Sequence, residues 1–136
     1  MSVVGIDTSV AVPLLVATHP LHAQVVGWCD QRELALCGHA LAETYSVLTR
    51  LPGDMRVSPA AAAQLIDAWF AEPLQIDPEA GHDLVGVLSR ADISGGAVYD
   101  ALVALAAVAN AVPLATRDAR ATETYNRLGA EVVVVG

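Results

Sequence analysis

The sequence predicts an α/β fold: a single three-layer domain over residues 1–136, in which about seven helices flank a central, mostly parallel sheet of five strands. Short β-branched apolar runs alternate with longer stretches of helical spacing, an order typical of parallel sheets covered by helices. The chain is 54% hydrophobic but only 4% aromatic, so its core is built from Ala, Val and Leu, which suits small-residue helices on a buried sheet. One domain of this size leaves no room for a separate catalytic module, so any site must be built into the fold.

The predicted strands are short apolar runs that end at a polar residue, a glycine or a turn. The first run ends at Asp7, and Thr8 and Ser9 then offer capping groups for a helix. The second run is followed by Gly38, which turns the chain into another helix. The five strands are expected at residues 3–7, 34–37, 74–76, 113–116 and 131–135.

Proline and glycine set most of the predicted helix boundaries. Pro13 keeps the first helix short, whereas Pro20 and Pro78 each open a helix, because proline is tolerated in the first turn. Gly129 ends the last helix. The helices are expected at about residues 8–16, 20–32, 38–51, 60–71, 78–91, 97–110 and 120–128.

Two acids stand near the starts of predicted helices. In the third helix, Leu41, Tyr45 and Leu48 are spaced for an apolar face, so Glu43 lies on a different side. Asp100 falls in the first or second turn of the helix that begins at about residue 97. Both helices follow the same edge of the predicted sheet.

The charge composition narrows the possible mechanisms. The formal net charge is −8, and all seven basic residues are Arg. A mechanism that needs a catalytic lysine is therefore excluded, while Arg remains a good bidentate clamp for phosphate. An acidic chain is at first sight a poor partner for nucleic acid. Four of its acids, however, belong to the site argued below, where divalent cations would offset part of the charge.

The compartment and the cysteines have simple interpretations. The longest apolar run, residues 101–109, is too short to cross a membrane, and no basic region precedes an apolar segment at the N-terminus. We therefore expect a cytoplasmic protein without membrane contact. Cys29 and Cys37 form no CxxC motif and no Cys/His cluster, so we expect free, buried thiols and no zinc site.

Four carboxylates are expected to meet at one edge of the sheet. Asp7 and Asp118 each follow a strand, and Glu43 and Asp100 begin helices that follow the same edge. Ligands of open parallel sheets bind beyond the carboxyl ends of the strands, where the strand order reverses. Four unpaired carboxylates would raise one another's pKa, so such a cluster calls for a hard cation such as Mg²⁺ or Mn²⁺.

Each acid also has a purely structural interpretation. Asp7 or Asp118 can cap a helix, Asp100 can interact with a helix dipole, and Glu43 can be a solvated helix residue. Taken together these interpretations are less persuasive, because Asp7 follows four apolar strand residues, where a solvated acid has no reason to be.

The residues around the four acids resemble one known family. The strings GIDTS around Asp7, ALAETYSVLTRLP around Glu43, ISGGAVYDALVALA around Asp100 and ATRDARATETYNRLGAEV around Asp118 are similar to the four acidic motifs of the PIN domain, in the form seen in VapC-type toxins. The match covers nearly the whole chain. Each motif alone is weak, but four in order make chance agreement improbable.

The resemblance implies a metal-dependent endoribonuclease, the toxin of a type II toxin–antitoxin pair. The family's acids correspond to Asp7, Glu43, Asp100 and Asp118, which would hold one or two Mg²⁺ or Mn²⁺ ions, and hydroxyls at Ser9 and Thr116 would orient a carboxylate or water. By analogy, metal-activated water attacks the phosphodiester in line and leaves a 5′-phosphate and a 3′-hydroxyl. We expect Asp7 and Asp100 to be direct metal ligands, and Asp118 to be the next in rank. Glu43 is the acid that we would first assign to a role behind the ligands or facing the substrate.

The resemblance also implies partners. The expected ones are an RNA substrate and a VapB-like antitoxin that places a basic side chain among the acids. A homodimer, and a heterotetramer or larger assembly with the antitoxin, are expected as well. The apolar excess of residues 10–16 and of the helix that carries Trp28 also suggests such a homodimer.

Several other residues are weaker candidates. Arg117 and Arg120 flank Asp118 and are candidate contacts for RNA phosphates, although a solvated helix start explains them equally well. His39 lies four residues before Glu43 and is within reach of the cleft, but we expect it to cap the helix or lie on the surface. Trp28 and Trp69 are expected in the core or an interface.

Four other functions compete with the nuclease interpretation. A phosphoaspartate phosphatase needs a second Asp where Ser9 stands, and a receiver domain needs a lysine, which the chain lacks. A FLAP-like DNA nuclease needs substrate-binding segments for which the chain has no room. The serious alternative is a non-catalytic, metal-stabilised module that binds RNA or protein.

Overall fold

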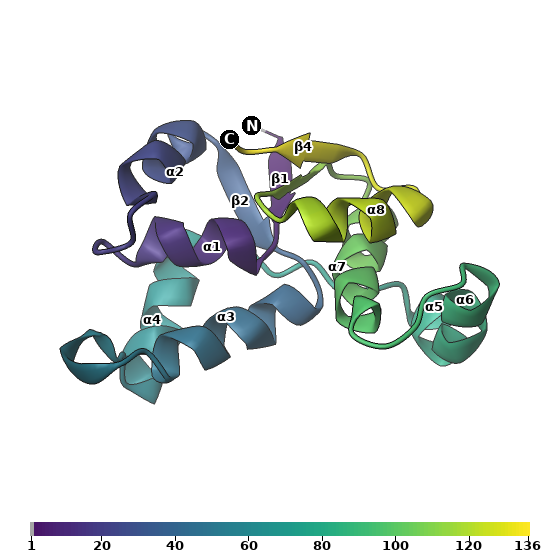
Figure 1. The fold of residues 1–136 in the computed structure, drawn as a ribbon, viewed down its shortest axis with the longest axis horizontal. Coiled ribbons are helices and arrows are strands. Elements are labelled where there is room, and N and C mark those ends of the chain that lie inside the picture. The colour runs from purple at the N-terminus through teal and green to yellow at the C-terminus, as the bar shows by residue number, and fades with distance from the viewer. Residues whose placement is uncertain (1) are drawn as a thin grey trace.

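The predicted α/β fold with a parallel sheet is confirmed. The computed structural model describes residues 2–136, which form a sheet of four parallel strands in the order β2-β1-β3-β4 (Figure 1). The strands are β1 (Val3–Ile6), β2 (Glu33–Leu36), β3 (Leu114–Thr116) and β4 (Val132–Val134). From β1 the chain continues to β2 on one side and then crosses to β3 on the other, so the order reverses between β1 and β3.

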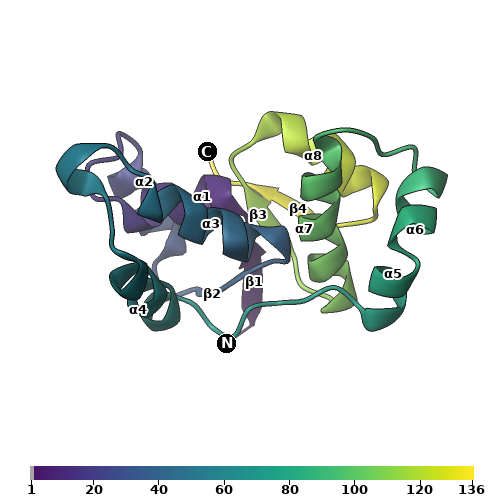
Figure 2. The ribbon, with the colours of Figure 1, turned by 90° about the horizontal axis from the view of Figure 1, so that it is seen from below.

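Residues 2–136 contain eight α-helices and one short 3₁₀ helix. Figures 1 and 2 show α5 and α6 at one end of the molecule, with α2 and α4 at the other. The α-helices are α1 (Thr8–Leu15), α2 (His22–Cys29), α3 (His39–Thr49), α4 (Pro59–Trp69), α5 (Pro78–His82), α6 (Leu84–Arg90), α7 (Ala97–Ala109) and α8 (Ala119–Arg127), and the 3₁₀ helix is Gly53–Met55.

The prediction of a fifth strand at residues 74–76 is wrong. Leu74 makes a single parallel bridge, to Cys37, through hydrogen bonds from Leu74 N to Leu36 O (2.9 Å) and from Gly38 N to Leu74 O (2.8 Å). Pro73 has no N–H to donate to a longer ladder. The next carbonyl, that of Gln75, accepts from the Asn110 side chain at 3.0 Å instead of from a strand. The segment therefore stays an extended connection.

Two helix predictions also need correction. The single helix expected at 78–91 is two, α5 and α6, which meet at Asp83 with φ −101° and ψ 26°. In α3 the buried residues are Ala40, Thr44 and Leu48. Tyr45, which we placed on the apolar face, is 38% exposed.

The core is built from strand residues and from the small-residue faces of α1 and α7. Ile6, Val10, Ala104 and Leu114 are fully buried there. Since Val10 and Leu14 lie in this core, the apolar excess of residues 10–16 is largely an interior feature, contrary to its assignment to a dimer.

Gly38 brings α3 against α7. It has φ +49°, and a β-carbon at this position would lie 2.5 Å from the carbonyl oxygen of Leu102 in α7. Only glycine combines this backbone conformation with so close an approach. As a result the first turn of α3 lies beside the first turns of α7, and the two helices carry Glu43 and Asp100.

Two further predictions concern the thiols and the membrane. Cys29 and Cys37 are free and buried, as expected. Burial raises the pKa of the Cys37 thiol to about 12, so it remains protonated at neutral pH. Over residues 2–136, no helix has the length and apolar character that crossing a bilayer demands.

Candidate active site

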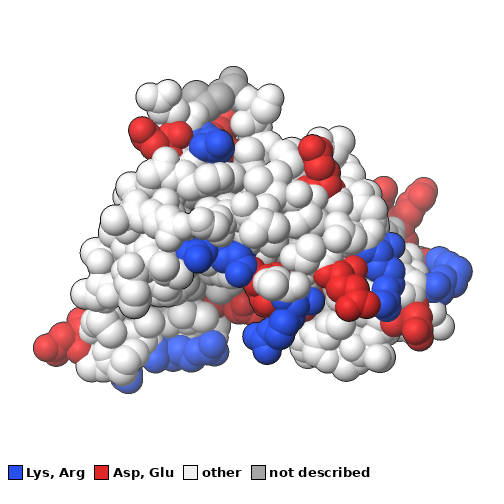
Figure 3. Space-filling model, turned by 45° about the horizontal axis from the view of Figure 1, so that its top comes forward, with Lys and Arg blue, Asp and Glu red and all other residues white. Residues whose placement is uncertain are grey.

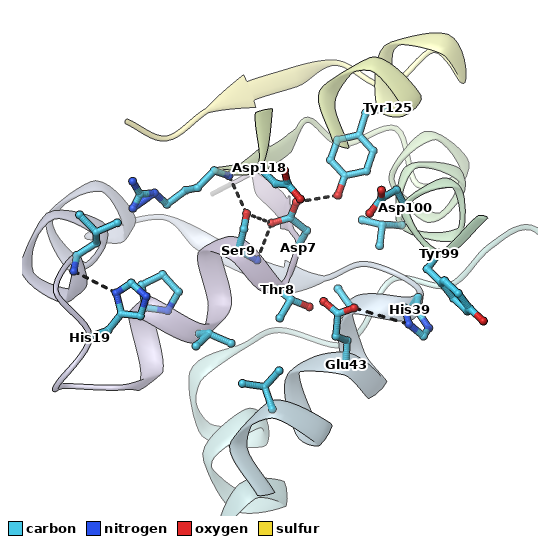
Figure 4. A pocket seen from close by; sticks show the side chains of 17 residues that line it. Asp7, Thr8, Ser9, His19, His39, Glu43, Tyr99, Asp100, Asp118 and Tyr125 are labelled. Atoms are coloured by element: carbon cyan, nitrogen blue, oxygen red, sulfur yellow. Dashed lines mark hydrogen bonds and ion pairs between the residues drawn. The ribbon is translucent and has the colours of Figure 1, made fainter. Parts of the chain in front are cut away.

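The four predicted acids line one cleft of about 470 Å³. It opens at the carboxyl ends of β1 and β3, where the strand order reverses, and its walls come from α1, α3, α7 and α8. Figure 4 shows the carboxylates of Asp7, Asp100 and Asp118 on one side and that of Glu43 across from them. Strands far apart in the sequence thus bring together residues that helices alone would leave separate.

Asp7 is the most firmly held of these acids. It follows β1, is 3% exposed, and lies one position beyond the Ile6–Ala115 pair of the β1–β3 register. Its Oδ1 accepts from the Ser9 amide at 3.0 Å and the Ser9 hydroxyl at 2.5 Å. Its Oδ2 accepts from the Thr116 hydroxyl at 2.5 Å and the Tyr125 hydroxyl at 2.7 Å. A buried carboxylate is stable here because both of its oxygens are fully hydrogen-bonded.

Ser9 and Thr116, predicted to orient a carboxylate or water, both donate to Asp7. Each is held in turn by a backbone amide: Arg117 N donates to Ser9 Oγ at 2.7 Å, and Asp118 N donates to Thr116 Oγ1 at 3.0 Å. These bonds tie the end of β1 and the start of α1 to the turn after β3. The same network therefore fixes Asp7 and the backbone that carries Asp118.

Asp118 and Asp100 occupy helix starts, as expected. Asp118 caps α8, accepting from Arg120 N at 3.0 Å, and also lines the cleft, so its capping and cleft-facing interpretations both hold. Asp100 lies in the first turn of α7. Burial raises the pKa of Asp100, the carboxylates of Asp118, Asp7 and Glu43 raise it further, and Arg120 lowers it. The other three acids therefore lie close enough to Asp100 to disfavour its charged form.

Glu43 belongs to the open side of the cleft. Its side chain is 45% exposed, and its only ion pair among residues 2–136 is a long one, with His39 Nε2 at 3.9 Å. His39 lines the cleft and its ring lies 4.8 Å from that of Tyr99, centroid to centroid. We expected His39 to cap the helix or lie on the surface. It reaches the cleft because Gly38 draws the first turn of α3 onto α7.

The two arginines beside Asp118 point in different directions. Arg117 lines the cleft, but its Nε donates to the Val135 carbonyl at 3.2 Å, away from the acids, and its buried Nη1 has no partner among residues 2–136. Arg120 lies 3.7 Å from Asp118 Oδ1 with a side chain that is 95% exposed. Arg120 is thus the more exposed of the two.

Tyr125 is a site residue that the sequence analysis missed. It is 1% exposed, on a helix whose other buried residues, Ala121 and Thr124, have helical spacing with it. That spacing could have identified Tyr125 as buried. Nothing in the sequence, however, indicates which buried oxygen its hydroxyl meets.

The donor set suits a hard divalent cation. The four acids supply only oxygen ligands, as Mg²⁺ and Mn²⁺ prefer. Within residues 2–136, Asp7, Glu43 and Asp100 have no Arg within ion-pair distance, and the chain has no Lys. No three His, Cys, Asp or Glu side chains of the described part are gathered tightly enough to form a ready-made cage. The four acids thus line the cleft without forming a tight cluster. Such a separation is expected of carboxylates that repel one another when no cation is bound.

The chain belongs to the PIN domain family, whose model matches residues 4–127. It is 59% identical over 130 residues to ribonuclease VapC27 of Mycobacterium tuberculosis, with 96% of this chain and 95% of that protein covered. It is 44% identical over 130 residues to ribonuclease VapC40 of the same species, with 95% and 96% covered. Within the family, the chain is therefore of the VapC type.

Solved structures agree on the fold. VapBC2 from Rickettsia felis, bound to a DNA fragment from their promoter, matches with a TM-score of 0.66 and covers 98% of each chain at 12% sequence identity. At so low an identity the likeness concerns the arrangement of strands and helices alone.

Proposed function

We propose that this protein is a Mg²⁺- or Mn²⁺-dependent endoribonuclease that acts in the cytoplasm as the toxin of a toxin–antitoxin pair. The observation that carries the proposal is the meeting of four carboxylates in one cleft, one of them buried and held by four donors. Such an arrangement is costly for a fold unless it serves a cation. The names of the two relatives, both ribonucleases, support RNA as the substrate.

The residues of this chain would divide the work. Asp7, Asp100 and Asp118 would hold the cation, and Glu43, on the open side, would orient water or the substrate. Ser9 and Thr116 keep the Asp7 carboxylate in a single orientation. When bound, the cation supplies positive charge for the scissile phosphate and lowers the pKa of coordinated water.

RNA binding by so acidic a protein would rely on local groups. Figure 3 shows separate groups of arginines among acidic side chains on the face in view, without an extended basic patch. Arg120 is free to swing toward a phosphate, and Arg117 would have to leave the Val135 carbonyl to do so. At the rim, the Tyr99 ring is 54% exposed and offers a face for a base.

The test is turnover on a pool of structured RNAs with Mg²⁺ or Mn²⁺, comparing the parent with Asp7→Asn and Asp100→Asn. We expect cleavage by the parent and none by either variant. The alternative, a non-catalytic metal-stabilised module that binds RNA or protein, gives equal RNA binding by all three proteins and cleavage by none. That result would reject the nuclease. Anomalous scattering from Mn²⁺-soaked crystals should place density between Asp7 and Asp100.

The proposal includes two protein partners. A VapB-like antitoxin would place a basic side chain in the acidic cleft. The 59% identity to the VapC-type ribonuclease VapC27 supports such a partner, and the negative charge of the cleft favours a basic side chain there. Failure of the neighbouring-gene product to copurify or to inhibit cleavage would count against it.

A homodimer is supported by exposed apolar side chains such as Trp69 (53%) and Val85 (80%). Light scattering at tens of micromolar would show a monomer if this part is wrong.

A further inference from the structure

Tyr125 lies where the acids converge. Its ring is buried in α8, and its hydroxyl points into the cleft toward Asp7, with Asp100 and Asp118 close by (Figure 4). Burial, and then the negative charge of Asp7, raise the pKa of Tyr125 well above its usual range. The phenol is therefore a neutral donor under all physiological conditions. Its hydroxyl therefore donates a hydrogen bond within the group of carboxylates that would bind a cation.

Asp7 has no lone pair left for a cation. A carboxylate offers about four acceptor positions, and the four hydrogen bonds from Ser9, Thr116 and Tyr125 occupy them. If Asp7 is to ligate a metal directly, one of these donors must give way.

The four donors are not equally free to leave. The Ser9 amide belongs to the backbone of α1. The Ser9 and Thr116 hydroxyls also accept from the amides of Arg117 and Asp118, which keep them in place. Among residues 2–136, the Tyr125 hydroxyl has Asp7 as its only hydrogen-bond partner. It is the donor whose departure disturbs the fewest other contacts.

We propose that Tyr125 is a positioning residue that occupies Oδ2 of Asp7 in the metal-free protein and releases it when Asp7 binds a divalent cation. The hydroxyl thus competes with the metal and sets its affinity. The inference rests on the proposed function in one respect, that these acids are the cation ligands. It explains how a buried carboxylate stays stable when no metal is present.

The test measures Mn²⁺ affinity by isothermal titration calorimetry, with the metal alone as the probe. Tyr125→Phe keeps the ring and removes the competing donor, so we expect Mn²⁺ to bind roughly tenfold more tightly, as the loss of one hydrogen bond to a charged group would give. Tyr45→Phe, which removes a tyrosine hydroxyl outside the cleft, should bind Mn²⁺ like the parent. Unchanged or weaker binding by Tyr125→Phe would overturn the inference.

A second measurement covers the case in which Tyr125→Phe does not fold. The chain has three tyrosines, so Tyr125 is the sole tyrosine in a Tyr45→Phe/Tyr99→Phe protein. Adding Mn²⁺ should shift its near-ultraviolet absorption to shorter wavelength, because the phenol loses a carboxylate acceptor. Mn²⁺ binding without this shift would reject the role of Tyr125 but not the proposed metal dependence. A parent that binds no Mn²⁺ would reject the proposed metal dependence with it.

Discussion

The two sides of the cleft are built differently. On the strand side, Asp7 is held by three side chains and a backbone amide and is 3% exposed. On the helix side, Glu43 projects from α3 with a side chain that is 45% exposed and one long contact, to His39. The strand side is therefore preorganised, whereas the helix side can adjust to what enters the cleft.

The difference follows from how each element fixes a side chain. At the end of β1, the amide of Asp7 is hydrogen-bonded to Ala115 O at 3.4 Å, and the short side chain has little freedom left. Glu43 stands on a helix surface, and its longer side chain has several rotamers to choose from. A site of this kind combines a fixed ligand with an adaptable one.

The largest expected effect is on catalysis. Asp7→Asn should lower the RNA cleavage rate by at least about 10³-fold, because it removes a fixed metal ligand. Glu43→Gln should lower it by only about 10-fold, in the range of residues that act through another group. Initial cleavage rates at saturating Mn²⁺ measure both. Asp54→Asn, an exposed acid outside the cleft, is the matched control and should cleave like the parent.

The relative size of the two losses is the informative result. If Glu43→Gln is as damaging as Asp7→Asn, then Glu43 is a direct ligand and the helix side is not a passive rim. If neither variant differs from Asp54→Asn, the cleft is not the catalytic centre.

Stability should separate the two sides next. In the presence of a chelator, Asp7→Ala should lower the free energy of unfolding by about 2–4 kcal/mol, because it leaves the buried hydroxyl of Tyr125 and the donors of Ser9 and Thr116 without an acceptor. Glu43→Ala should change it by less than about 0.5 kcal/mol, as at most surface sites. Urea denaturation of the metal-free proteins gives both values. Equal losses in the free energy of unfolding would mean that the hydrogen bonds to Asp7 do not stabilise the fold.

The sequence could predict the strand side well. A carboxylate directly after β1 is conspicuous because four apolar strand residues precede it, and parallel strands place the residues that follow them at one edge. That reasoning placed Asp118 beside Asp7, and it depends only on local pattern and on the direction of a strand. The hydroxyls of Ser9 and Thr116 were instead indicated by the resemblance to the PIN domain.

Contacts between helices could not be predicted from the sequence. His39 reaches the cleft because Gly38 lets α3 touch the Leu102 carbonyl, and that approach is a matter of packing and not of spacing. The Tyr125–Asp7 bond depends on how α8 lies over the end of β1. The missing fifth strand was misjudged for a similar reason, since an apolar run beside Pro73 can pack without forming a ladder.

Asp100 lies between the two sides, and its protonation measures the repulsion across the cleft. Its folded-state pKa is raised, first by burial and then by Asp118, Asp7 and Glu43. Between the unfolded value of about 3.9 and that raised value, the folded state binds more protons, so stability falls as the pH rises through this window. Above it, the charged Asp100 destabilises the metal-free protein in full.

Replacing Asp100 should remove this penalty. At neutral pH, metal-free Asp100→Asn should melt about 2 °C above the parent, a small gain because the group is partly solvated. The gain should shrink as the pH falls through the raised pKa of Asp100, because the parent's Asp100 then becomes protonated as well. With saturating Mn²⁺ the order should reverse, because the parent gains more from binding. Asp54→Asn, the control, should show neither change in melting temperature. If the higher melting temperature of Asp100→Asn persists in acid, the charge of Asp100 is not the source of the penalty.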